Sequence, residues 1–478
     1  MLSGSRTARA YLLALGTAFL LAAPWFAAGG GYARITAFKA AAYGILTGLF
    51  LLLSLFDPPK LRGRKPAPER LLALGYLFFC LLSALCSPWK RTAFLGGGRR
   101  EGFLHIALYV LSFLILSFRR IPRRGLTCAF AAALALQDLV CLLQLAGVNA
   151  LGLYPPGLGW ADANLRYTGS FLGTMGNAGQ TASVLAAASA FLYLSILQRG
   201  GKHVLLLPLL ALNALLLAVM DVTAPILALG AVMLLSLLFY GRTLRGLCRW
   251  GCVSCLTAAF LGLRLLGDLS GAWGLGLTVL AGLCFIRLRR VPGDRDLRAW
   301  PPRILGLFFA LALTLLPLYR GWYTPLREAA ALLRGCVDEN MGSGRIYIWR
   351  QVLHAVPAHL WLGTGPDTLA MRDLPPYIYY SREAGCSVTL GIDAAHCEFL
   401  HTLVCCGLPA ALCHLGLALC AALGFFRRRD SGRICAGVAF CYALQALFGI
   451  SMCASAPVFW VFLALSLSEG GAGPESDG

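Results

Sequence analysis

Residues 342–407 read GSGRIYIWRQVLHAVPAHLWLGTGPDTLAMRDLPPYIYYSREAGCSVTLGIDAAHCEFLHTLVCCG, and they form the longest polar interval in an otherwise apolar chain. This stretch holds four of the seven histidines and several arginines. A charged side chain near the centre of a bilayer costs about 3 kcal/mol. A polar stretch of this length therefore lies outside the bilayer or lines a wet cavity. We expect the chemistry of the protein in this interval.

The composition indicates an integral membrane protein. Of 478 residues, 58% are hydrophobic and only 13% are charged, whereas soluble domains carry roughly 25% charged residues. The formal net charge of +20 comes from short basic clusters between apolar runs, which is typical of cytoplasmic loops beside anionic lipid. The basic residues are not gathered in one domain, so nucleic acid is not predicted as a partner.

The apolar runs predict an all-α polytopic protein with about 12–14 transmembrane helices, because a helical span needs about 20 apolar residues. We expect an N-terminal bundle at 1–319, a large loop at 320–396, C-terminal spans at 397–468 and a disordered tail at 469–478. The individual runs are 10–28, 35–56, 71–87, 103–118, 125–148, 171–197, 203–220, 223–240, 247–267, 271–287, 304–319, 397–426, 432–449 and 455–468.

The distribution of basic residues predicts the orientation. With the N-terminus inside, the loops that alternation assigns to the cytoplasm are rich in Arg or Lys, and most of the opposite loops are poor in them, as the positive-inside rule requires. Loop 320–396 is then extracytoplasmic. The main exception is the basic segment 88–102, which is predicted outside.

The N-terminal half of the polar interval predicts an anion contact. Gly342 and Gly344 break the chain, and a helix is expected from about Arg345 to Pro357. Arg345 lies at the edge of the apolar stripe of this helix, where its planar guanidinium suits a phosphate or diphosphate. An arginine that simply reaches the membrane interface is the alternative. The stripe consists of Trp349, Val352, Leu353 and Val356.

The C-terminal half predicts a turn and a base. Gly363 and Gly365 allow a tight turn that offers N–H groups to an anion, although this motif by itself favours a plain turn. Asp393 is predicted to cap the following helix, which places His396 in its first turn, where the helix dipole favours the neutral imidazole of a general base. Glu398 falls in the same turn. No catalytic role is predicted for the other three histidines, His354, His359 and His401.

The cysteines do not predict a metal centre. Most lie inside apolar runs, where cysteine acts as a small hydrophobe, and the Cys252–Cys255 pair has no second pair beside it. Cys336 and Cys386 share the large loop, which leaves a disulfide open.

Several motifs together resemble the O-antigen ligase and O-antigen polymerase superfamily of membrane glycosyltransferases. The resemblance covers the central and C-terminal two-thirds of the chain. Its motifs are Gly344-Arg345 through Trp349-Arg350, Leu362-Gly363-Thr364-Gly365, His396-Cys397-Glu398-Phe399-Leu400, Gly407, and the upstream segments GGRREG (97–102) and GSFLGTMGN (169–177).

The resemblance implies an inverting glycosyltransferase of the bacterial inner membrane. It would move a glycan from an undecaprenyl-diphosphate carrier to a hydroxyl of an acceptor glycan or lipid, with no metal or other cofactor. By motif, Arg345 would neutralise the diphosphate leaving group and His396 would accept the proton of the acceptor hydroxyl. Arg350, Gly363, Gly365 and Glu398 would contribute to substrate binding.

The chain departs from the family pattern at two places. Cys397 stands where the family commonly has asparagine, and segment 221–225 lacks the second diphosphate-binding arginine. Other arginines on the predicted outer side are candidates to replace it, and we favour Arg99 or Arg100 because their loop breaks the positive-inside pattern. A basic loop lying on anionic lipid is the alternative. The remaining candidates are Arg166, Arg372 and Arg382.

Two other functions stay open. A transporter or flippase of lipid-linked sugars is a different class of protein. A transporter is expected to have charged residues within its spans and internal repeats, whereas this chain has few such charges and no obvious repeat. A catalytically impaired family member is the third possibility, because the second arginine is missing. The sequence does not distinguish a ligase from a polymerase.

Overall fold

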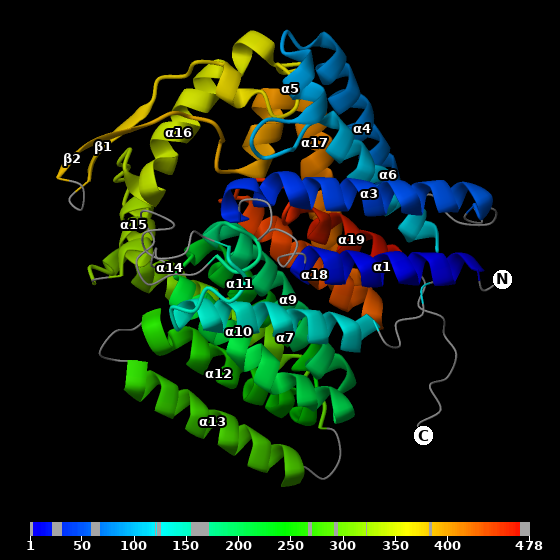
Figure 1. Cartoon of the computed structure of the whole chain (residues 1–478). Coiled ribbons are helices and arrows are strands. Elements are labelled where there is room, and N and C mark those ends of the chain that lie inside the picture. The colour runs from blue at the N-terminus through cyan, green and yellow to red at the C-terminus, as the bar shows by residue number, and fades with distance from the viewer. Residues whose placement is uncertain are drawn as a thin grey trace. The chain divides into compact units, whose positions relative to one another are not determined.

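The computed structural model describes residues 3–21, 31–58, 67–119, 121, 126–153, 172–265, 270–290, 295–321, 323–381 and 385–468. Within these ranges the chain is almost entirely helical (Figure 1). It forms two compact units, one made of residues 1–184 with 351–478 and the other of residues 185–350. Each unit is described by itself.

The first unit is a helix bundle built from both ends of the chain. Helix α17 packs against α4 and α18, α19 packs against α6 and α18, and α3 packs against α1 and α6; α1 and α3 lie side by side in Figure 1. The helices are α1 (Ser3–Leu21), α3 (Ile35–Phe56), α4 (Pro68–Cys86), α5 (Lys90–Leu95), α6 (Phe103–Phe118), α7 (Leu126–Leu145), the start of α9 (Ala178–Arg199), α17 (Glu398–Arg427), α18 (Asp430–Ala446) and α19 (Ala456–Leu467), with the 3-10 turn η1 (Gly31–Arg34) before α3.

The core of this bundle is aromatic. The Trp460 indole on α19 lies 5.9 Å between centroids from both Tyr76 and Phe113, which come from α4 and α6. Aromatic side chains bury large apolar areas in such contacts. Through Trp460 the C-terminal helix is joined to two N-terminal ones.

The second unit contains the remaining helices. Helix α12 packs against α13, α10 and α11, and α11 also contacts α14. The Tyr193 hydroxyl from α9 lies 2.6 Å from Ser254 and 3.3 Å from Ser236, so these three hydroxyl groups are paired inside the unit. The elements are the rest of α9, η2 (Gly201–Leu206), α10 (Leu207–Met220), α11 (Thr223–Tyr240), α12 (Leu244–Leu265), α13 (Ser270–Arg290), α14 (Trp300–Leu315), η4 (Leu316–Leu318), α15 (Thr324–Leu333) and α16 (Met341–Ala355) up to Arg350.

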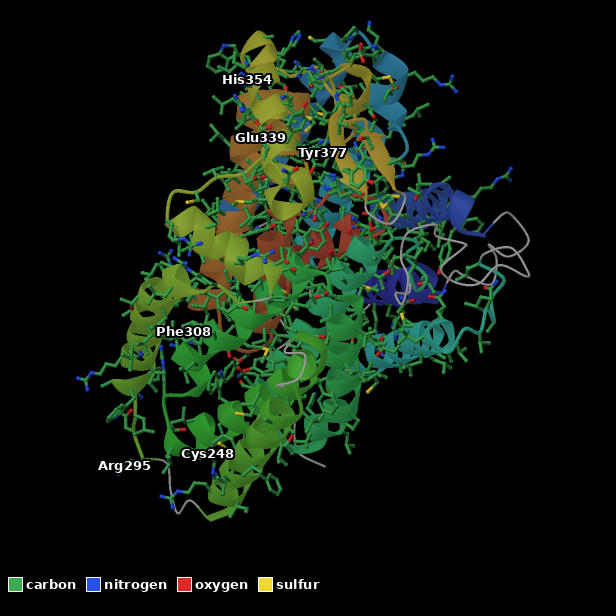
Figure 2. All side chains as sticks on the ribbon, turned by 90° about the vertical axis from the view of Figure 1, so that its left-hand side faces the viewer. Cys248, Arg295, Phe308, Glu339, His354 and Tyr377 are labelled. Atoms are coloured by element: carbon green, nitrogen blue, oxygen red, sulfur yellow. The ribbon has the colours of Figure 1, made fainter. Side chains whose placement is uncertain are left out.

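The predicted fold class is confirmed. Eight helices in the described ranges are long and apolar enough to cross a membrane, and each predicted apolar run contains a helix, so the protein is an all-α multi-pass membrane protein. Apolar side chains such as Leu313 and Phe308, the latter labelled in Figure 2, stay exposed along α14, as lipid-facing surfaces require. Helix α9 begins at Ala178 rather than 171, because Gly173 and Gly176 adopt left-handed backbone.

The predicted loop at 320–396 carries secondary structure of its own. It includes α15, α16, the 3-10 turns η5 (Pro357–His359) and η6 (Leu369–Met371), and an antiparallel hairpin of β1 (Tyr377–Ser381) and β2 (Cys386–Leu390) with Tyr379 opposite Val388. The apolar stripe of α16 is partly confirmed, since Val352 and Val356 are buried while Leu353 is 53% exposed. The predicted tail at 469–478 lies outside the described residues.

Candidate functional site

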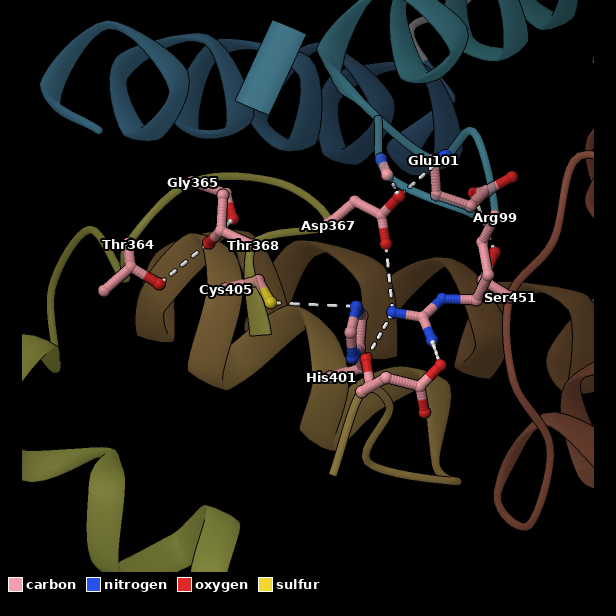
Figure 3. A network of polar contacts seen from close by, with 11 residues as sticks. Arg99, Glu101, Thr364, Gly365, Asp367, Thr368, His401, Cys405 and Ser451 are labelled. Carbon is pink, nitrogen blue, oxygen red and sulfur yellow. Dashed lines mark hydrogen bonds and ion pairs between the residues drawn. The ribbon is translucent and has the colours of Figure 1, made fainter. Parts of the chain in front are cut away.

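The buried Arg99 guanidinium joins three distant segments of the first unit (Figure 3). Its Nη2 lies 3.0 Å from Asp367 Oδ1, and its Nη1 lies 3.1 Å from Asp393 Oδ2. Nη2 also donates to the Asp393 carbonyl at 2.5 Å. Arg99 comes from the loop between α5 and α6, whereas the aspartates come from the polar interval, 268 and 294 residues later in the chain. We call Arg99, Asp367 and Asp393 the arginine clamp.

Asp367 joins the arginine clamp to the backbone of the loop between α5 and α6. Its Oδ2 accepts the Gly97 N–H at 2.6 Å and the Glu101 N–H at 3.3 Å, so this buried carboxylate binds both the Arg99 side chain and the backbone on either side of it. A buried charge is tolerated when it is paired and hydrogen-bonded in this way. The loop between α5 and α6 is thereby fixed in shape.

The prediction that Asp393 caps the helix is wrong. Helix α17 begins at Glu398 with Cys397 at its N-cap, and Asp393 instead binds Arg99. His396 therefore precedes the helix rather than standing in its first turn, and its φ of 49° is left-handed. Such a backbone costs a non-glycine residue about 1–2 kcal/mol and persists only where its surroundings hold it.

The glycine turn is packed onto a break in α17. The N–H groups of Thr364 and Gly365 donate to the Cys405 carbonyl at 2.9 and 2.8 Å, and the Gly363 N–H donates to the His359 carbonyl at 2.8 Å. These amides are thus already hydrogen-bonded within the chain. The geometry gives Gly363 and Gly365 a packing role, and the predicted substrate-binding role stays a prediction.

The facing glycine on α17 is Gly407, which interrupts the helix with φ 82° and ψ 174°. A Cβ atom at Gly407 would lie 2.1 Å from the Trp361 carbonyl oxygen, and one at Gly363 would lie 2.1 Å from that of Cys405. The two backbones approach too closely for any side chain. The motif residues around 363 and 407, separate in sequence, are one contact in the structure.

Two buried glutamates lie next to this region. The Tyr109 hydroxyl donates to Glu101 Oε1 at 2.8 Å and the Ser451 hydroxyl to Oε2 at 2.9 Å, while the Tyr442 hydroxyl donates to Glu398 Oε1 at 3.0 Å. Burial raises the pKa of the Glu101 carboxyl to about 8, and the charges of Asp367 and Glu398 act in the same direction. Sequence reasoning missed Glu101, although it stands inside the GGRREG motif.

Glu101→Gln is expected to flatten the pH dependence of stability. The folded protein binds the Glu101 proton more tightly than the unfolded chain, so stability falls as pH rises from the ordinary glutamate pKa towards about 8. The variant cannot titrate, so its thermal midpoint should fall less than that of the wild type over this window. Unfolding in detergent at a series of pH values measures this, with Glu339→Gln at an exposed carboxyl as the control. Parallel curves for wild type and Glu101→Gln would contradict the assignment.

His401 is a second site histidine that sequence reasoning assigned no role. Its Nε2 lies 3.6 Å from Cys405 Sγ, and its Nδ1 is buried without a partner among the described residues. Arg99 and His396 both lie close enough to act electrostatically on the ring. An unpaired buried nitrogen has no sequence pattern, so only the fold reveals it.

Arg345 lies in the second unit, as does Arg350. The predicted break is confirmed, since residues 342–344 all adopt left-handed backbone and a regular helix follows. Arg345 Nη1 donates to the Gly342 carbonyl at 2.5 Å, and its Nε is buried without a partner among the described residues. Burial lowers the pKa of this guanidinium, and the Glu328 carboxylate opposes the effect. Arg345 is thus a partly desolvated cation with free donor capacity.

The other predicted arginines differ in their surroundings. Arg350 is exposed and pairs with Glu339 Oε1 at 2.5 Å. Arg100 is exposed with φ 58°, and Arg372 donates to the Ala355 carbonyl at 2.8 Å. Arg166 and Arg382 lie outside the described residues.

Residues 208–415 match the family model described as O-antigen ligase. This part of the chain is similar to the O-antigen ligase family. The predicted resemblance to the ligase and polymerase superfamily of membrane glycosyltransferases is thereby confirmed. A search of curated proteins found none that matches the chain.

The matched region, residues 208–415, includes both residues predicted to be catalytic, Arg345 and His396, and the two aspartates of the arginine clamp. Arg99 and Arg100 precede it. The first unit therefore attaches an N-terminal loop to the His396 segment of the matched region. All eighteen cysteines are free, including Cys336 and Cys386, and the described residues contain no cluster of three or more metal-ligating side chains.

Proposed function

We propose that the protein transfers a glycan from an undecaprenyl-diphosphate carrier to a hydroxyl of an acceptor glycan or lipid. The transfer takes place on the outer side of the bacterial inner membrane, where the loop at 320–396 lies. The supporting observation is the convergence of the GGRREG loop, Asp367 and the His396 segment on the arginine clamp. Motifs that are far apart in the sequence thus meet in one place of a multi-pass membrane protein.

His396 acts as the general base of this reaction. It accepts the proton of the acceptor hydroxyl while the hydroxyl oxygen forms a bond to the anomeric carbon. The bond from that carbon to the diphosphate oxygen breaks on the opposite face, so the configuration inverts. Arg345 neutralises the charge that develops on the diphosphate. The step needs neither a metal nor a nucleotide sugar.

Other predicted residues of the site bind the substrate or support the segments that surround it. Arg350 is exposed and held by a surface ion pair, which is worth little energy, so an anionic substrate competes readily for it. Glu398 is buried and the two turn glycines are tightly packed, and they hold the segments around His396 in place. Arg166, outside the described residues, stays a candidate contact.

Reconstitution tests the proposal. The purified protein in liposomes should convert lipid-linked glycan, extracted from a host strain lacking the protein, into transferred glycan and free undecaprenyl diphosphate. The reaction should proceed in EDTA, and NMR should show an inverted anomeric centre. Movement of intact lipid-linked glycan across the bilayer without a change of bonds would indicate a flippase instead, and neither activity would indicate an impaired member.

A further inference from the structure

The two adjacent arginines of the GGRREG loop have opposite surroundings. Arg99 is 9% exposed and makes three contacts with two aspartates. Arg100 is exposed, and its guanidinium makes no hydrogen bond or ion pair with the described residues. The buried Arg99 and the exposed Arg100 are therefore expected to have different roles.

The charge balance argues against Arg99 as the anion contact. One guanidinium is paired with two carboxylates, Asp367 and Asp393, so the clamp as a whole carries a net negative charge. A diphosphate approaching it would meet like charge, and it would have to displace a buried carboxylate that is also bound to two backbone N–H groups. Breaking such a buried pair costs several kcal/mol.

We propose that Arg99 is a positioning residue that holds the His396 segment in place, and that Arg100 is the cation of this loop that contacts the diphosphate. The second half rests on the proposed function, whereas the first half does not. Arg100 thereby supplies the charge that is missing from segment 221–225.

Arg99 is connected to His396 through Asp393 and two buried alanines. Arg99 binds Asp393 through both its carboxylate and its carbonyl, and the two residues between Asp393 and His396, Ala394 and Ala395, are buried at 1% and 0% exposure. The left-handed backbone of His396 therefore has one end fixed by the clamp and the packed alanines. The other end is the start of α17 at Glu398.

The same clamp presents Arg100 outward. Asp367 binds the backbone N–H groups of Gly97 and Glu101, and the Arg100 N–H donates to the Gly97 carbonyl at 3.2 Å. Arg100 thus occupies the left-handed turn that Asp367 closes. A fixed turn lowers the conformational entropy that a cation loses on binding an anion.

Three variants separate the two roles: Arg99→Gln, Arg99→Lys and Arg100→Gln. The measurements are amide hydrogen exchange of residues 391–397, affinity for undecaprenyl diphosphate in lipid nanodiscs, and kcat and KM with extracted lipid-linked glycan. For Arg99→Gln we expect exchange to rise about tenfold and kcat to fall roughly 100-fold, because small displacements of a catalytic group are costly, while Kd stays within about threefold. Arg99→Lys should restore part of kcat, because an ammonium still neutralises the carboxylates.

For Arg100→Gln we expect the reverse pattern, with Kd and KM raised about tenfold by the loss of one charged contact and exchange unchanged. Equal losses of affinity in Arg99→Gln and Arg100→Gln, with unchanged exchange in both, would overturn the division of roles. If the wild type does not bind undecaprenyl diphosphate, the proposed function fails, yet the exchange comparison still decides whether Arg99 is a clamp. If Arg99→Gln does not fold, Asp393→Asn replaces it in the exchange measurement. This variant weakens the Arg99–Asp393 ion pair at a carboxylate whose side chain is 69% exposed.

Discussion

His396→Ala in the native host is expected to abolish the surface polysaccharide while the protein stays in the membrane. Without the imidazole, no group accepts the proton of the acceptor hydroxyl, and general-base catalysis contributes about 10²–10⁴ in rate. The lipid-linked precursor should accumulate because its supply continues. Quantified polysaccharide, extracted precursor and an immunoblot of the membrane fraction measure the three effects.

The matched control is His354→Ala, at an exposed histidine of α16 with no predicted role. This variant should keep wild-type polysaccharide. Arg345→Ala should match His396→Ala, because removing one group that stabilises developing charge costs about 10²–10³ in rate. Normal polysaccharide in both His396→Ala and Arg345→Ala would end the enzymatic interpretation.

Gly363→Ala and Gly407→Ala are expected to destabilise the first unit severely. In each case the added Cβ would lie 2.1 Å from a backbone carbonyl oxygen of the facing segment, and φ is +64° or +82°. The left-handed backbone alone costs about 1–2 kcal/mol, and the clash additionally forces the turn away from α17. Lower yield and a thermal midpoint lowered by many degrees in detergent are the expected results.

Gly391→Ala is the control for this prediction, since a Cβ there meets nothing within 4 Å and its φ is not left-handed. Its midpoint should equal that of the wild type. A Gly363→Ala protein as stable as Gly391→Ala would show that the turn is not packed against α17 as described.

The helices are predictable from the sequence because lipid leaves few choices. Every backbone polar group in a bilayer must be hydrogen-bonded internally, so a long apolar run such as the one that forms α3 or α11 can only be a helix. The start of α9 was missed by several residues because two left-handed glycines set it. Local turn chemistry of this kind is weaker than apolar periodicity.

The candidate site is less predictable because its contacts are long-range. Asp393 resembles a helix cap in sequence, but its partner Arg99 is 294 positions away. The basic loop at 88–102 did mark Arg99 and Arg100 as unusual, yet nothing local tells which of them is buried. The unpaired Nδ1 of His401 and the hairpin partner of Tyr377 likewise depend on the folded chain.

The most direct test of the mechanism is an experimental structure of the protein bound to undecaprenyl diphosphate in a lipid nanodisc. We predict that the diphosphate lies on the Arg345 guanidinium, with the His396 ring facing the position of the transferred sugar. Diphosphate bound away from both residues, or Arg345 and His396 on opposite sides of the bilayer, would contradict the mechanism.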